Sequence, residues 1–145
     1  MRCSSRIKIN KNRIDQLSRA AVISLEETAE ALHTEIVQAG VVPRDTGNLE
    51  GESFYVDRSE STEGKVSLVH NTPYARKLYF HPEYNFHQEP WEETKRREDG
   101  KEVTVKHDGN PNAKGKWFKD WLPGGKKADF AQETFKEIYR RNAGL

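Results

Sequence analysis

NRIDQLSRAAVISLEETAEALHTEIVQAGVVP, residues 12–43, is the stretch that decides the fold of this chain. Apolar side chains recur in it at spacings of three or four, as they do along one face of an α-helix. Asn12 is a candidate N-cap with Asp15 in the first turn, Gly40 is a candidate C-cap, and Pro43 prevents the helix from resuming. We therefore predict a helix over residues 12–39. Its apolar stripe consists of Ile14, Leu17, Ala21, Leu25, Thr28, Leu32 and Ile36.

Short alternating segments flank this helix on both sides. Residues 6–10 alternate polar and apolar side chains, which predicts a short strand before the helix. Residues 52–57 and 65–70 are strand candidates separated by a polar turn, so we expect them to pair antiparallel. Residues 74–80 are predicted to form a short helix after the second of these strands.

Residues 81–115 are rich in His, Pro, Asn, Glu and Lys and poor in aliphatic side chains. Within them, Asp99-Gly100 lies between the runs 92–98 and 101–107, and Asp-Gly in that position is a strong hairpin signal. We predict a projecting β-hairpin or loop over residues 87–110, with Val103 and Val105 on one face. A disordered segment is the alternative interpretation of this composition.

The C-terminal third is expected to complete the core. Residues 117–122, WFKDWL, are the densest apolar cluster and are predicted to anchor the core as a short helix or turn. Residues 126–141 are predicted to form a closing helix. The fold class is therefore α+β: a long N-terminal helix packed on a small, mainly antiparallel sheet, with a C-terminal helix and a projecting β-hairpin, in one domain of residues 1–145.

Composition excludes several classes of protein. Charged residues make up 32% of the chain and hydrophobic residues 34%, so the core is modest. A single cysteine, Cys3, excludes an intrachain disulfide framework and a multi-cysteine zinc site. No apolar run is long enough to span a membrane and the N-terminus lacks the apolar region of a signal peptide, so we expect the chain to be made and kept in a cytoplasm, or released by lysis, and to contact no membrane.

The patterns typical of enzymes are missing. His70, His81, His87 and His107 do not have the spacing of a metal site, and the chain contains neither a Gly-x-Ser-x-Gly elbow nor a phosphate-binding loop. The lysines that follow Gly124 and Gly125 are better explained as a helix-entry loop than as an anion site. We expect no enzymatic activity, no catalytic residues, no metal and no cofactor.

Nucleic-acid binding is the alternative function. Residues 95–97, KRR, and the lysines at 114, 116 and 119 beside two tryptophans resemble surfaces that grip phosphates and stack bases. However, the net charge is only +1, whereas a dedicated nucleic-acid binder is strongly basic. Core packing is the favoured role of Trp117 and Trp121.

Three further motifs are typical of turns and of junctions between secondary-structure elements: VPRDTGNL at residues 42–49, NTPYA at 71–75, and NAKGKWF at 112–118. Their order after a long helix resembles the minor capsid, or head–tail joining, proteins of long-tailed bacteriophages of Gram-positive hosts, including the neck and tail-completion proteins. The resemblance runs from about residue 14 to residue 141. The stretch 87–107 looks longer than the corresponding link in those families.

This resemblance implies a structural virion protein of the phage neck, which joins the DNA-filled head to the tail as a subunit of a homo-oligomeric ring. The implied partners are further copies of the chain, the portal, adaptor or stopper proteins, the tail-terminator protein, and packaged DNA passing through the channel. The implied location is the virion, after assembly in the host cytoplasm. We expect a ring closed by heterologous contacts between neighbouring subunits.

Three segments are the candidate contact regions: the turn at 45–48, the aromatic-rich loop at 79–86, and the hairpin at 92–107. Aromatic side chains are many for so polar a loop, and aromatic residues are enriched at interface hot spots. The expected interface residues are Asp45, Thr46, Asn48, Tyr79, Phe80, Tyr84, Phe86, Trp91, Arg96, Arg97, Val103 and Val105.

Overall fold

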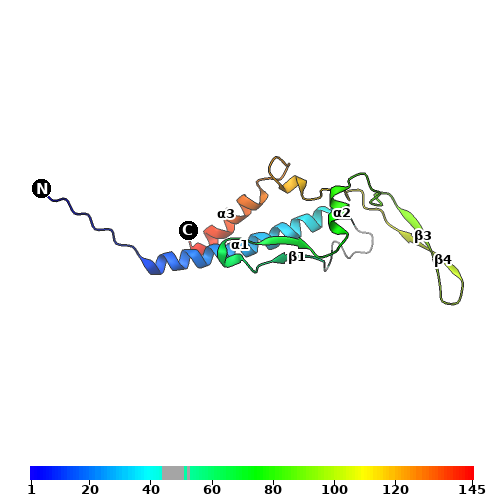
Figure 1. Ribbon diagram of the computed structural model, residues 1–145, viewed down its shortest axis with the longest axis horizontal. Coiled ribbons are helices and arrows are strands. Elements are labelled where there is room, and N and C mark those ends of the chain that lie inside the picture. The colour runs from blue at the N-terminus through cyan, green and yellow to red at the C-terminus, as the bar shows by residue number, and fades with distance from the viewer. Residues whose placement is uncertain (44–50, 52) are drawn as a thin grey trace.

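The computed structural model describes residues 1–43, 51 and 53–145, and its longest element is helix α1, Lys11–Ala39 (Figure 1). The Asn10 side chain caps α1 by accepting a hydrogen bond from the Arg13 backbone N–H at 3.1 Å, so the cap lies two residues before the predicted Asn12. Gly40 ends the helix with φ 64°, a left-handed conformation that glycine adopts without a Cβ penalty. The predicted strand over residues 6–10 is wrong: these residues form neither helix nor strand and are exposed.

The closing helix is α3, Phe130–Ala143, and it lies antiparallel along α1 (Figure 1). Small side chains at Ala20, Ser24 and Thr28 are buried on α1, which lets the helices approach closely. The Ser24 hydroxyl donates to the Ala20 carbonyl at 2.6 Å and accepts from the Asn142 amide at 3.0 Å. The main packing partner of α1 is therefore α3, in addition to the sheet that the sequence predicts.

The small antiparallel sheet and the projecting hairpin are two separate two-stranded ladders. Strands β1, Phe54–Asp57, and β2, Ser67–His70, pair with Phe54 opposite His70, and the short helix η1, Ser61–Glu63, lies in their connection. Strands β3, Trp91–Arg96, and β4, Glu102–His107, form the projecting hairpin (Figure 1). The short helix α2, Ala75–Phe80, follows β2. The α+β class, both helices and the hairpin are confirmed.

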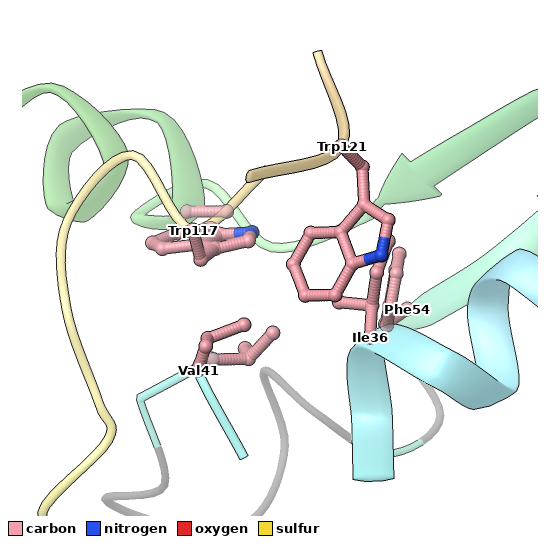
Figure 2. Packing of buried hydrophobic residues seen from close by; sticks show 7 residues of the cluster. Ile36, Val41, Phe54, Trp117 and Trp121 are labelled. Atoms are coloured by element: carbon pink, nitrogen blue, oxygen red, sulfur yellow. The ribbon is translucent and has the colours of Figure 1, made fainter. Parts of the chain in front are cut away.

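The core lies at the C-terminal end of α1, where β1, α2 and residues 113–121 meet (Figure 2). Trp117 is its largest fully buried side chain, packed edge-on against Tyr79 with ring centroids 4.9 Å apart. The Trp117 indole N–H donates to Nε2 of His70 at 3.1 Å. The predicted anchoring role of residues 117–122 is confirmed, with η2, Lys119–Trp121, as the short helix. The buried cluster consists of Ile36, Val41, Val42, Phe54, Ala75, Trp117 and Trp121.

The predicted apolar stripe of α1 is buried unevenly. Ile36 is fully buried in the core and Leu32 packs against it, whereas Ile14, one turn into the helix, is exposed. Leu17 and Leu25 are half-buried. The first turns of α1 therefore extend past the body, and the molecule is long and narrow, with the N-terminus and the hairpin at opposite ends (Figure 1).

We expect an ion pair beside the core to make stability depend on pH. Lys114 Nζ lies 3.0 Å from Asp120 Oδ2, and this hydrogen bond holds the pKa of Asp120 below its ordinary value of 3.8. The Asp120 side chain is 25% exposed. We expect Asp120→Asn to lower the free energy of unfolding by about 1 kcal/mol at pH 7.

Because the pKa of Asp120 is lowered in the folded state, the wild-type advantage is complete well above pH 3.8 and is lost as the pH falls through the folded pKa. Urea denaturation of wild type and Asp120→Asn at pH 7, 5, 3 and 2 measures this. Lys114→Met is the matched control, since it removes the same pair and should add nothing to Asp120→Asn. A difference that grows on acidification would contradict the prediction.

Candidate assembly surfaces

The hairpin β3–β4 has two chemically different faces. Cross-strand partners share a face, so the pairs Trp91↔His107, Glu93↔Val105 and Lys95↔Val103 lie on one side. The opposite side consists of charged residues and threonines only: Glu92, Thr94, Arg96, Glu102, Thr104 and Lys106. The sequence prediction that Val103 and Val105 share a face is confirmed. Both are half-buried.

The hairpin ends in a tight turn. The Gly100 N–H donates to the Arg97 carbonyl at 2.9 Å, and the Lys101 N–H donates to the Asp99 carboxylate at 3.0 Å. Gly100 has φ 82°, which explains the need for glycine in the Asp-Gly pair. Arg96 and Arg97 are exposed near this tip.

An aromatic stack holds the base of the hairpin. The Trp91 ring lies between His87 and His107, with centroid distances of 4.1 and 4.2 Å. A cavity of about 470 Å³ beside it is lined by both β3 and the end of α1, including Trp91 and Val37. Phe86 also lines this cavity and is only 7% exposed, so its ring is packed inside the subunit and offers little surface to a partner.

The other predicted interface aromatics divide between the core and the surface. Tyr79 packs on Trp117 and Phe118 in the core, where burial raises the pKa of its phenol. Phe80 and Tyr84 are exposed, and Tyr84 stacks on His81 with centroids 4.7 Å apart. The aromatic loop is therefore partly a core element, and two of its rings face solvent. Asp45, Thr46 and Asn48 lie outside the described residues.

Two histidines have structural contacts. His70 stacks on Phe54 at 4.3 Å in the core, and Nε2 of His33 lies 2.9 Å from the Phe54 carbonyl oxygen. His81 pairs with Glu83, whose pKa is lowered by the hydrogen bond. Among the described residues, no three His, Cys, Asp or Glu side chains cluster as a metal site requires.

Burial of the tryptophans weakens the nucleic-acid interpretation. Trp117 and Trp121 are both buried, so neither ring is free to stack on a base. Lys114 is paired with Asp120, and Lys127 is paired with Glu35 while lying over the Trp121 ring. The predicted core role of the two tryptophans is confirmed.

Two apolar surfaces were missed by the sequence reasoning. The first, here called the apolar groove, has a volume of about 190 Å³ between α1, β2 and residues 118–122. Its lining residues are Leu32, Ile36, Leu68, Phe118, Trp121 and Leu122. The second, here called the N-terminal tail, is residues 1–10, in which Ile7 and Ile9 are 85% and 67% exposed. The sequence signal that could have identified the tail is the pair Ile7 and Ile9 within a basic segment.

Comparison with protein-family models, with curated proteins and with solved structures found no match for this chain. Among the residues that the structure describes, no helix is long and apolar enough to cross a membrane.

Proposed function

We propose that this chain is a structural subunit of a phage neck, which forms a ring and joins the DNA-filled head to the tail. The observation that carries the proposal is the ordered series of junction motifs after a long helix, with the last motif running from residue 112 to residue 118. Its partners are further copies of itself, the portal, adaptor or stopper proteins on the head side, and the tail-terminator protein on the other.

The second and third junction motifs, residues 71–75 and 112–118, connect elements of the subunit, which is a structural role. Ala75 of the second motif and Ala113 of the third are buried. The Lys114 N–H donates to the Val41 carbonyl at 3.1 Å, and the Lys116 N–H donates to the Tyr79 carbonyl at 2.8 Å. The third motif therefore ties the end of α1 to α2.

The sparse core also supports a protein that works in an assembly. Among the described residues twelve apolar side chains are buried, and five of these are alanines, so the subunit hides little large apolar surface. On α3, Phe135, Ile138 and Tyr139 are only half-buried. Partly exposed apolar surface and a projecting arm are features that neighbouring subunits would cover.

Electron microscopy and a salt titration test the proposal together. Purified protein is expected to self-associate into rings and to bind duplex DNA weakly or not at all. Virions should contain the protein at the head–tail joint, located by antibody labelling. A monomeric protein whose DNA affinity is high and falls steeply with salt would instead favour the nucleic-acid-binding alternative.

A further inference from the structure

The N-terminal tail has an apolar side with no cover in the subunit. Extended backbone places residues two apart on the same side, so Ile7 and Ile9 present one apolar edge while Arg6 and Lys8 point away from it. Figure 1 shows the tail leading away from the body, and all ten of its residues are exposed. Ile7 and Ile9 together form a small exposed apolar edge in a chain of low apolar content, and a partner surface would cover it.

The apolar groove is a matching surface at the other end of α1. Leu32 and Ile36 of α1 line it, and Leu122, which also lines it, is 49% exposed. An engineered cavity of about 150 Å³ accepts a benzene ring, so a groove of about 190 Å³ has room for at least one isoleucine side chain. The second isoleucine would then lie over the rim.

The tail of a subunit is too short to reach its own groove. Leu32 lies 21 residues after Lys11, the first residue of α1, which is about 32 Å along a helix that rises 1.5 Å per residue. Ile7 lies four residues before Lys11, so even a fully extended chain carries it back only about 14 Å. A tail that occupies the groove must therefore come from another molecule.

Charge favours a second copy as that molecule. Residues 1–19 contain six Lys or Arg and one Asp, whereas residues 20–43 contain four Glu and no Lys or Arg. A basic tail laid over the acidic half of a neighbouring α1 is electrostatically complementary. Glu27, Glu30 and Glu35 already pair with Arg141, Arg58 and Lys127. The charges would therefore set the orientation of the tail more than its affinity.

We propose that Ile7 and Ile9 of one subunit occupy the apolar groove of the next, so that each copy of this chain binds the following copy through the same pair of surfaces. Such a contact is heterologous, and repetition of it gives a ring if the rotation closes. The inference rests on the self-association proposed above and names the contact that produces it.

Mixing two complementary full-length variants tests the contact. The donor carries Leu122→Asp, which blocks its groove, and an environment-sensitive dye on Cys3, the only cysteine in the chain and an exposed one. The acceptor carries Ile7→Asp and Ile9→Asp, which disable its tail and leave its groove intact. We expect a saturable dye signal and heterodimers that do not grow further, because each pair has one working contact.

The matched control is Ile23→Asp in the acceptor, since Ile23 is 50% exposed on α1 outside the groove. It should leave binding unchanged, whereas Leu122→Asp in the acceptor should weaken binding about tenfold or more, because the loss of one buried aliphatic contact is worth at least that factor. If Leu122→Asp fails to fold, the comparison is made on the tail instead: labelled protein with Ile7→Asp and Ile9→Asp is compared with labelled protein whose tail is intact. These exposed side chains are not needed for the fold.

The outcomes distinguish a failure of the tail-in-groove contact from a failure of the proposed function. Equal binding by the Leu122→Asp and Ile23→Asp acceptors, or no dye signal while wild type still forms rings, would overturn the tail-in-groove contact and leave the neck function standing. No self-association of wild type at any concentration would count against both.

Discussion

Deletion of residues 93–106, with Glu92 joined to His107 through a Gly-Ser link, is expected to leave the melting temperature nearly unchanged and to impair the proposed head–tail joining. The strands β3 and β4 pack mainly on each other, so their removal exposes little of the core. Trp91 faces His107 across the ladder, so the cut ends are close enough for a short link. Calorimetry measures the melting temperature, and electron microscopy counts filled heads, free tails and joined particles.

A pair of double variants separates the two faces of the hairpin. Val103→Asp with Val105→Asp places charge on the face that includes Trp91, and Thr94→Asp with Thr104→Asp places the same charge on the opposite face. All four original residues are β-branched, so the loss of strand propensity is comparable. We expect the valine variant to impair joining and the threonine variant to be tolerated. If the deletion variant gives normal particles, the hairpin has no role in joining. If the deletion variant is unfolded, the hairpin belongs to the core.

Trp117→Ala is expected to lower the free energy of unfolding by about 3–5 kcal/mol, because it leaves a large cavity in the core and removes the hydrogen bond to His70. For a chain of this size that loss lowers the melting temperature by roughly 10 °C or more. Urea denaturation followed by circular dichroism measures it.

The matched control is Trp91→Ala, the same chemical change at the base of the hairpin. Trp91 is half-buried between two histidine rings and lies outside the core cluster, so we expect a cost of about 1 kcal/mol. Equal losses from the two substitutions would show that the hairpin base and the core form one cooperative unit. The core would then extend further than its buried cluster indicates.

Local patterns determined the elements of this fold. The spacing of apolar residues over 12–39 and 126–141 predicted both long helices, and Asp99-Gly100 predicted the hairpin with Val103 and Val105 on one face. These signals are periodic or confined to a turn, so they depend only on neighbours along the chain. The large apolar area of Trp117 and Trp121 predicted that both lie in the core.

Only the tertiary structure decided which surfaces meet. Ser24 and Asn142 are 118 residues apart, and their contact, like the whole α1–α3 packing, depends on where the connecting chain returns. The same holds for His70 beneath Trp117 and for Phe86, which the fold buries. Residues 6–10 have the pattern of a strand but no partner strand within the subunit, so no ladder hydrogen bonds offset the conformational entropy that an ordered strand loses. The sequence indicates which side chains are apolar enough to be buried, whereas the path of the chain determines which other surfaces lie near enough to bury them.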